Sequence, residues 1–443
     1  MLILSAEYKT KLTKSIGVTK FRSIAMIHIF NNQSKIFIFS CSFLIFFLYS
    51  CNGKRKSEII NNYSEIVIDN SNIPDTLDIS NVIDYIKVLK LTDHSEKPIS
   101  RIDQLYASGN TYIVIDAINT KRVNSYSADG KYLKTLMEVG PDKKQALNVT
   151  DCYLNEKNEV IIYDYAQMKL TVFNPDLSVK KVIQGKNLFH YNHIASIPGT
   201  EDYVGYASYN LDNTELQRDK KNPSSLDVLN SKLDLIKKHL TYPSKFEGII
   251  LITASKAFFP YKDSLRFFRA YDPYIYNINK NQIQRKYKIL YKKGNFPSDF
   301  LESIVANHLK EFQEIGRKSS SLQVIYKYFS GYTCPENWLE SDSIICLSSI
   351  NFLDRSTSIT NTIIFNQAKK RTILNAGTFV AKNDFKLSFP QFKAYDKHNN
   401  EFIASCTGNQ LKKQLHNGSP LINLKDIVDD SFYLIKVKFK PKR

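Results

Sequence analysis

Two aspartates follow strand-like segments at matching positions of a repeated pattern. Asp116 ends the segment TYIVID and Asp164 ends the segment EVIIYD. Carboxylates at equivalent positions of a ring of repeats could meet at its axis and serve as acids, bases or metal ligands. The alternative is that each carboxylate accepts backbone N–H groups of the turn that follows it. We favour this structural role, because a requirement of the fold recurs at matching positions of its repeats.

Histidines and acid pairs are the other candidates for chemistry. His190 and His193 have the i, i+3 spacing of ligands on a helix, but their segment has no helical pattern and no third ligand. Two acid pairs could form a glycosidase-type dyad, although solvated loop charges explain them more simply: Glu201 with Asp202, and Asp212 with Glu215. The sequence has no GxSxG, HExxH, phosphate-loop or dinucleotide motif and no sialidase SxDxGxTW box. We therefore assign no catalytic residue, metal ligand or cofactor.

The cysteines and the single tryptophan offer a cross-link and a contact surface. Cys334 and Cys346 flank a hairpin-like connection, and a disulfide between them would be permitted in an oxidising compartment. The alternative is that they are separate buried thiols, as is expected for Cys152 and Cys406. Trp338 stands in a polar, loop-like setting and is our candidate for a contact surface, unless it folds back onto the core.

Composition indicates a globular chain. Hydrophobic residues make up 43% and charged residues 23% of the 443 residues, which excludes a disordered protein. The formal charge is +18, but the basic clusters at 54–56 and 220–221 are not interleaved with aromatic residues, so we predict no nucleic-acid partner. The 27 Tyr and 27 Phe could stack on sugar rings, but we expect most of them to fill the core.

The N-terminal region resembles a bacterial lipoprotein signal. An uncharged apolar run follows Lys35; it is too short to span a bilayer and has the length of a secretory signal core. It ends in Leu-Tyr-Ser-Cys, which resembles a lipobox with Cys51 as the lipidated residue. We predict a signal peptide at 1–50, a lipidated tether at 51–75 and one domain at 76–443. Met26 is an alternative start, which would leave 1–25 outside the protein.

Short strands dominate the predicted domain. The two segments that end in Asp116 and Asp164 belong to units that repeat after about 50 residues, a period typical of β-propeller blades. Asp129-Gly130 is a typical two-residue hairpin turn within the first unit. The segment 83–91 is our candidate to complete the C-terminal blade, which would remove an exposed sheet edge. Apolar residues at helical spacing predict two short helical insertions, at 224–240 and 298–316.

The whole pattern resembles the Bacteroidota-type six-bladed β-propeller lipoproteins, a family of unknown function related in fold to NHL and TolB-like propellers. The resemblance is carried by DISNVIDYIKVLKLT, ISRIDQLYASGNTYIVID, VGPDKKQAL, GNFP and DDSFYLIKVKFK. It implies an all-β fold with six blades, where length alone also allows seven, and it brings no catalytic residues. Surface export in such bacteria is associated with an acidic run after the lipidated Cys; the run here is Asn52-Gly53-Lys54-Arg55-Lys56. This difference favours an outer-membrane protein that faces the periplasm.

The leading hypothesis is a lipid-anchored propeller of the cell envelope that binds or scaffolds an unknown protein or glycan partner. It rests on the repeat, the lipobox and the lack of catalytic motifs. The alternative is a hydrolase or lyase on the same fold, with a metal site at the axis.

Overall fold

The computed structural model describes most of the chain from Ile59 onward. The described residues all belong to the unit Ile59–Arg443, and the predicted signal peptide and Cys51 lie outside the described residues. The described residues are 59, 62–93, 96, 98–140, 149–185, 191–207, 223–246, 249, 256–269, 271–314, 326–354, 358–367, 371–382, 385–415 and 419–440. None of the helices in these ranges is long and apolar enough to cross a membrane.

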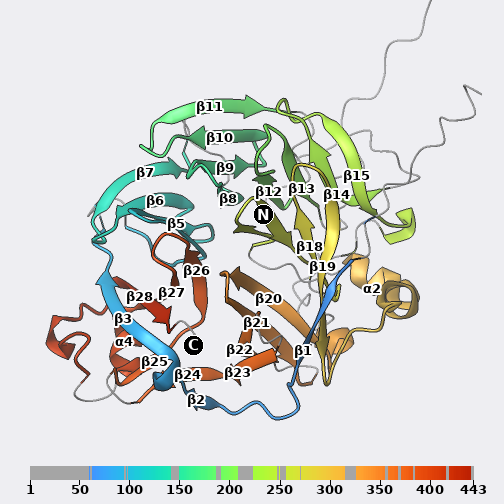
Figure 1. Cartoon of the computed structure of the whole chain (residues 1–443). Helices are drawn as coiled ribbons and strands as arrows, with labels where there is room; N and C mark the ends of the chain where they lie inside the picture. The colour runs from blue at the N-terminus through green and yellow to red at the C-terminus, as the bar shows by residue number, and fades with distance from the viewer. Residues whose placement is uncertain are drawn as a thin grey trace, which may run out of the picture. The chain divides into compact units, whose positions relative to one another are not determined.

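Four antiparallel sheets follow one another from the N-terminal side of the ring (Figure 1). The first contains β4 (Gln104–Ser108), β5 (Thr111–Asp116), β6 (Arg122–Ser127) and β7 (Tyr132–Glu138). The second contains β8 (Asp151–Leu154), β9 (Val160–Asp164), β10 (Lys169–Phe173) and β11 (Val179–Gln184). The third contains β12 (His193–Ser196), β13 (Tyr203–Tyr206), β14 (Ser224–Leu229) and β15 (Leu235–Thr241). The fourth contains β16 (Phe258–Tyr261), β17 (Ser264–Phe267), β18 (Tyr274–Ile278) and β19 (Ile283–Tyr291).

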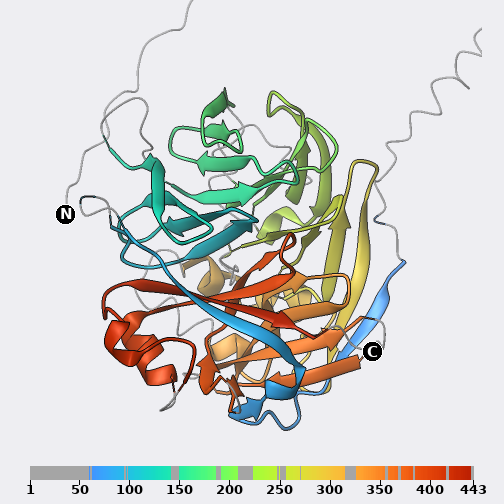
Figure 2. The same cartoon turned by 60° about the vertical axis from the view of Figure 1, so that its left-hand side comes forward.

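Two further large sheets complete the ring (Figure 2). The fifth contains β20 (Thr333–Glu340), β21 (Ile344–Phe352), β22 (Ser358–Asn366) and β23 (Arg371–Ala376). The sixth contains β26 (Phe392–Asp396), β27 (Glu401–Thr407), β28 (Phe432–Phe439) and the N-terminal strand β3 (Ile83–Lys90). The first strands β4, β8, β12, β16, β20 and β26 contact one another in this cyclic order around the axis. The all-β propeller fold predicted from the repeat is confirmed.

The described chain has seven sheets, which corrects the prediction of six blades. The seventh sheet has three strands: β2 (Thr76–Asp78), β24 (Thr378–Ala381) and β25 (Leu387–Phe389). It lies between the fifth and sixth sheets, where β2 contacts β23 and β24 contacts β22. The sequence pattern missed it because its strands are only three or four residues long and because β2 comes from the far end of the chain.

The predicted closure by the N-terminal side is confirmed. Strand β3 pairs antiparallel with β28, from Lys90 opposite Tyr433 to Ile83 opposite Phe439. A second N-terminal strand, β1 (Ser64–Ile68), pairs in parallel with β19 and gives the fourth sheet a fifth strand. The edges of β19 and β28 are therefore both covered by residues that precede the first repeat.

The hairpin prediction at Asp129-Gly130 is also confirmed. Gly130 has a positive φ of 82° in the turn between β6 and β7. A Cβ atom at this position would lie 2.2 Å from the main-chain oxygen of Lys90 in β3. The turn therefore needs glycine both for its backbone conformation and for the close approach of the closing strand.

Of the two predicted helices, one is wrong and one is confirmed. Residues 224–240 form β14 and β15, because Asn230 accepts hydrogen bonds from the N–H groups of Lys232 and Asp234 and turns the chain. In strand form, Leu226 and Leu229 still reach the core, so their spacing fits both structures. The second segment is helical at Leu301–Val305, Ala306–His308 and α2 (Leu309–Glu314). The chain also has a short helix α4 (Gly408–Gln414), which we did not predict.

Apolar clusters fill the spaces between neighbouring sheets. The largest joins strands of the second, third and fourth sheets and includes Tyr163, Tyr206, Phe267 and Tyr276. Among the largest fully buried side chains, all but one are Tyr or Phe, and the exception is Trp338. The aromatic excess therefore serves chiefly to pack the sheets against one another, as the sequence led us to expect.

A buried carboxylate on β27 bonds to both the closing strand β3 and β28. Glu401 at the start of β27 is 2% exposed; it accepts a hydrogen bond from Tyr85 of β3 (2.5 Å) and pairs with the Lys436 ammonium at 2.7 Å. Glu401→Gln should lower the free energy of unfolding by roughly 3 kcal/mol, because it leaves a largely buried ammonium without its counter-charge. Urea unfolding of the two proteins measures this difference.

The matched control is Glu65→Gln on β1. Its carboxylate is 54% exposed and lies 3.9 Å from the Lys288 ammonium. This substitution should change the free energy of unfolding by less than about 0.5 kcal/mol. Equal losses in the two variants would show that the Glu401 ion pair does not stabilise the closure.

Candidate functional site

The two aspartates chosen from the repeat hold turns. Asp116 accepts hydrogen bonds from the N–H groups of Ser100 (2.9 Å) and Asn119 (2.9 Å). Burial alone would raise its pKa, but these hydrogen bonds keep the pKa of Asp116 below its usual value. Asp164 accepts from the N–H of Gln167 (3.1 Å). The structural interpretation of both residues is confirmed.

The histidine and acid candidates do not form a reactive site in the described part of the chain. His193 is buried on β12, where Nδ1 lies 3.3 Å from Asp151 Oδ2 and the ring stacks on Tyr206. Glu201 is exposed and lies 3.5 Å from the Lys181 ammonium. Three other candidates lie outside the described residues: His190, Asp212 and Glu215. Among the residues that the structure describes, no group of three or more His, Cys, Asp or Glu could hold a metal ion.

The structure of β20 and β21 corrects the predictions for Trp338 and for the cysteine pair. Trp338 is 0% exposed and lies on a strand, so the predicted contact surface at this residue is wrong. Cys334 lies opposite Ile350, whereas Cys346 lies opposite Leu339. This offset of several positions separates the two thiols by more than the about 7 Å that a disulfide allows between Cα atoms. Both thiols are free and buried.

A cavity of the described domain lies at the propeller axis. It has a volume of about 430 Å³ and is lined by the first strands β4, β8, β16, β20 and β26, with Pro198 from the turn after β12. Its mouth lies among the turns that connect first and second strands, at Asn155–Asn158, Lys262, Ser341–Asp342 and Lys397–His398. The ring thus brings side chains far apart in sequence to one concave site.

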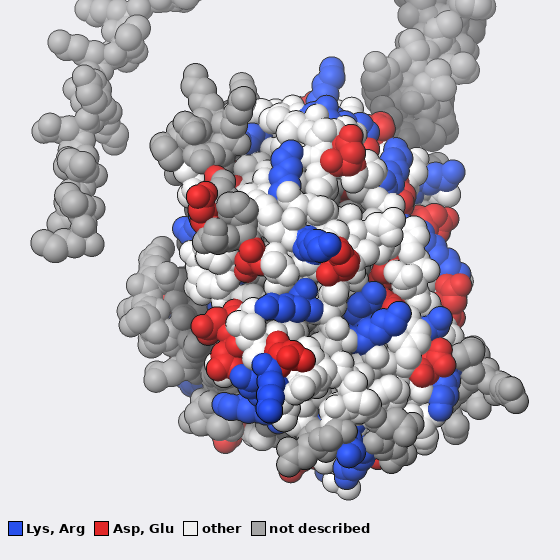
Figure 3. All heavy atoms as spheres, turned by 90° about the vertical axis from the view of Figure 1, so that its left-hand side faces the viewer, with Lys and Arg blue, Asp and Glu red and all other residues white. Residues whose placement is uncertain are grey.

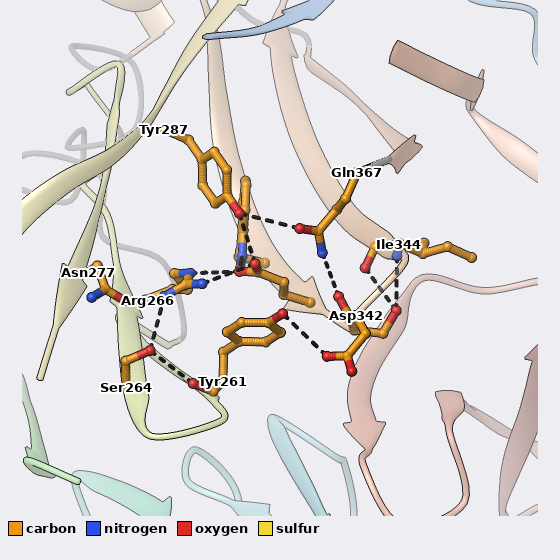
Figure 4. Close-up of polar contacts among 11 residues, drawn as sticks. Tyr261, Ser264, Arg266, Asn277, Tyr287, Asp342, Ile344 and Gln367 are labelled. Atoms are coloured by element: carbon orange, nitrogen blue, oxygen red, sulfur yellow. Dashed lines mark hydrogen bonds and ion pairs between the residues drawn. The ribbon is translucent and has the colours of Figure 1, made fainter. Parts of the chain in front are cut away.

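A buried carboxylate organises one wall of this axial cavity. Glu340 accepts two hydrogen bonds from the Arg266 guanidinium, at 2.7 and 3.1 Å, one from Tyr287 OH (3.0 Å) and one from Trp338 Nε1 (3.1 Å). Arg266 and Tyr287, both labelled in Figure 4, belong to the neighbouring fourth sheet. Four donors satisfy the carboxylate, so Glu340 fixes the wall in place and has little capacity left for a ligand.

The rim of the cavity joins the same two sheets. Asp342, in the turn after β20, lies 2.9 Å from the Lys262 ammonium and accepts a hydrogen bond from Tyr261 OH (3.3 Å), as Figure 4 shows for the tyrosine. The Arg266 guanidinium lies over the Tyr261 ring, 4.5 Å from its centroid. Tyr261 is therefore held from two sides, and it presents an ordered aromatic ring at the mouth.

A buried lysine crosses the interior of the ring. Lys256 precedes β16, yet its ammonium donates to the main-chain oxygens of Leu105 in β4 (2.6 Å) and Lys393 in β26 (3.2 Å). It also lies 3.9 Å from the centroid of the Tyr106 ring. Burial lowers the pKa of Lys256 to about 7, against the partial opposition of Asp151 and Cys152. Lys256 therefore links the segment before β16 to the inner strands β4 and β26 beside the axial cavity.

Two buried polar atoms in the cavity wall have no hydrogen-bond partner among the described residues. The Tyr153 side chain at the end of β8 is 2% exposed, and its hydroxyl is unpaired. Glu156, in the turn after β8, uses Oε1 to accept from the N–H of Gly199 (3.1 Å), while Oε2 has no partner. Buried polar groups are nearly always satisfied, so these two atoms mark where a ligand could bind.

Sequence reasoning missed the charged residues of this cavity. Arg266 and Glu340 stand next to large apolar residues in strand-like segments, and a charge in such a position was the available signal, whereas Lys256 lies between Ser255 and Ala257 and gave no such signal. Their partners come from other sheets, so no local pattern could bring them together. Figure 3 shows Lys and Arg interspersed with Asp and Glu on the face that lies to the left in Figure 1.

Comparisons with known proteins agree on the fold and leave the activity open. A family model described as a domain of unknown function (DUF4934) matches residues 64–431. A protein from Bacteroides fragilis that is thought to be exported is 14% identical, with 85% of this chain and 100% of that chain covered and a TM-score of 0.62. A DUF4221 family member from Bacteroides vulgatus is 7% identical, with 81% and 97% covered and a TM-score of 0.41. No curated protein matches the chain.

The lowered pKa of Lys256 predicts a pH dependence of stability. Because its pKa is about 7 in the folded chain and ordinarily 10.5, the unfolded chain holds the extra proton between these values, and stability rises with pH. The free energy of unfolding of the wild type relative to Lys256→Met should therefore increase from pH 7 to pH 9, by up to about 1.4 kcal/mol per pH unit. Urea unfolding at several pH values measures this difference.

The matched control is Lys397→Met, which removes an exposed lysine at the mouth of the same cavity. Its free energy of unfolding should follow the wild type in parallel over this pH range. If the free energy of unfolding of Lys256→Met changed with pH by the same amount as that of the wild type, the lowered pKa of Lys256 would be contradicted.

Proposed function

This chain belongs to the DUF4934 family, whose function is unknown, and we propose that it is a lipid-anchored β-propeller of the cell envelope that binds a ligand in its axial cavity. The observation that carries the proposal is the cavity itself, with its ordered aromatic walls and its unpaired polar atoms at Tyr153 and Glu156. Pockets of this size, apolar with a few placed polar groups, are typical small-molecule sites.

The anchor belongs to the proposal as well. The lipobox-like sequence at Cys51 supports attachment to a membrane through an N-terminal lipid, and a protein thought to be exported shares the fold at a TM-score of 0.62. We propose an outer-membrane location that faces the periplasm. The ligand would then be a periplasmic glycan or a segment of a protein partner, and nucleic acid is not expected there.

The alternative is a hydrolase or lyase with a metal at the axis. Such an enzyme needs three or more converging ligands from His, Asp, Glu or Cys side chains. The described residues of the axial cavity supply Glu156, Glu340, Asp342 and the exposed His398, but Glu340 is saturated by its four donors and Asp342 pairs with Lys262. No three of the described His, Cys, Asp and Glu residues form a group that could hold a metal ion. Binding without such chemistry is therefore the function that these residues support best.

Replacement of the lipidated cysteine tests the anchor. Cys51→Ala removes the thiol that would carry the lipid, so the protein should move from the membrane fraction to the soluble fraction of its own cells. Immunoblotting of the separated fractions measures this change. Cys152→Ala, which removes a buried thiol in β8, is the control and should leave the fractionation unchanged. Membrane association of Cys51→Ala equal to that of the wild type would contradict the anchor.

Filling the cavity tests the binding site. Ala107 on β4 lines the cavity, and Ala107→Phe would occupy part of its volume. A thermal-shift survey of saccharides, amines, carboxylates and short peptides should give at least one ligand whose stabilisation of the wild type is lost in Ala107→Phe.

Ala128→Phe is the matched control, because Ala128 is exposed in the turn between β6 and β7, away from the cavity. It should bind like the wild type. A ligand that stabilises the wild type and Ala107→Phe equally would contradict binding in the axial cavity.

A further inference from the structure

The chemistry of the axial cavity narrows the class of ligand, on the premise that the cavity is the binding site. We propose that it takes a neutral, polyhydroxylated ring, such as one or two saccharide units, and that Tyr153 and Glu156 determine this specificity through the hydroxyl groups of the ring.

The two unpaired atoms differ in what they need from a ligand: Glu156 Oε2 requires a hydrogen-bond donor, whereas Tyr153 OH can use a donor or an acceptor. The free Oε2 of Glu156 can only accept when the carboxylate is ionised. Burial and the nearby charge of Glu156 raise the pKa of Tyr153 well above its usual value, so this residue is a neutral hydroxyl that can both donate and accept. A sugar ring presents hydroxyls side by side, each of which can donate to a carboxylate and also bond to a tyrosine hydroxyl.

The charges around the cavity disfavour an ionised ligand. Glu156 would repel an anion, whereas Lys256 and Lys397 line the same cavity and would repel a cation. Two other carboxylates are already neutralised, because Glu340 pairs with Arg266 and Asp342 pairs with Lys262. The Lys256 ammonium donates to two main-chain oxygens, so it does not need an anionic ligand. A neutral ligand is therefore the class that none of these charges repels.

The aromatic walls fit the apolar face of a ring. Tyr261 and Tyr395 are both partly exposed at the mouth, from the fourth and sixth sheets. Tyr261 is fixed by Asp342, and Tyr395 OH donates to Asn400 (2.9 Å), so both rings are ordered before a ligand arrives. Pre-ordered aromatic rings bind at a low entropic cost. The C–H face of a sugar can pack on such rings while its hydroxyls reach Tyr153 and Glu156.

The test compares ligands that share one ring but differ in charge. Isothermal titration calorimetry would measure the binding of glucose, galactose, mannose, maltose and cellobiose, with glucosamine as the cationic and glucuronate as the anionic relative. At least one neutral sugar should bind, and its charged relatives should bind at least tenfold more weakly. Failure of every neutral sugar to bind, or tighter binding of an amine or a carboxylate, would overturn the assignment of ligand class.

Variants then test the two residues. Tyr153→Phe should weaken binding of the preferred sugar by about tenfold, and Glu156→Gln by about ten- to a hundredfold, as for the loss of a neutral and of a charged hydrogen bond. Ser196→Ala is the matched control, because Ser196 Oγ is also unpaired and buried but does not line the axial cavity. It should bind like the wild type. Tyr153→Phe and Glu156→Gln proteins that bind as tightly as the wild type would overturn the assigned roles.

The two proposals fail in different ways. If Ala107→Phe abolishes the binding of a peptide, an amine or a carboxylate while no neutral sugar binds, the cavity is a binding site and only the ligand class is wrong. If a sugar binds equally well to the wild type and to Ala107→Phe, its site lies elsewhere, and both the class assignment and the axial site are wrong.

Discussion

The structure depends on the closure of a ring between the two ends of one domain. Strand β3 lies near the start of the described chain. It forms the outer strand of the sixth sheet, next to β28, which is the last strand in the sequence. This pairing is non-covalent, and the described cysteines are all free, so backbone hydrogen bonds and side-chain packing alone hold the ring shut. Two further contacts lie at this junction. Glu401 bonds to Tyr85 of β3 and pairs with Lys436 of β28, and the turn at Gly130 lies close to the main chain of Lys90 in β3.

Closure explains why a site can exist at the axis at all. Each of the six larger sheets contributes one inner strand to the ring, and the cavity walls come from strands as distant in sequence as β4 and β26. Lys256 crosses this space to bond to both of those strands, and Glu340 gathers Arg266, Tyr287 and Trp338 on another wall. The polar groups that satisfy one another make the walls rigid, while Tyr153 and Glu156 are left with capacity to spare.

The sequence predicted the features that are encoded locally or by repetition. Period-two alternation, the Asp-Gly turn and the alternating segment 83–91 identified the strands, a hairpin and the closure. Local patterns failed where two structures share one spacing, as in 224–240, whose leucines fit a helix and a hairpin equally well. They also failed where polar neighbours suggested exposure, as at Trp338, because residues beside an axial cavity can be polar and buried together. The cavity itself could not be predicted, since its residues meet only through the ring.

The segment from Ser64 to Lys90 has a mechanical consequence. It lies along three sheets in succession, pairing β1 with β19, β2 with β24 and β3 with β28. A pulling force applied at the N-terminal end of this segment would reach β1 first. The five in-register pairs of β1 and the hydrogen bond from Asn375 to the Asp69 main chain would have to break before tension arrived at β3. Strand β1 would therefore bear such a force first, and the pairing of β3 with β28 that closes the ring would be loaded only after β1 had separated from β19.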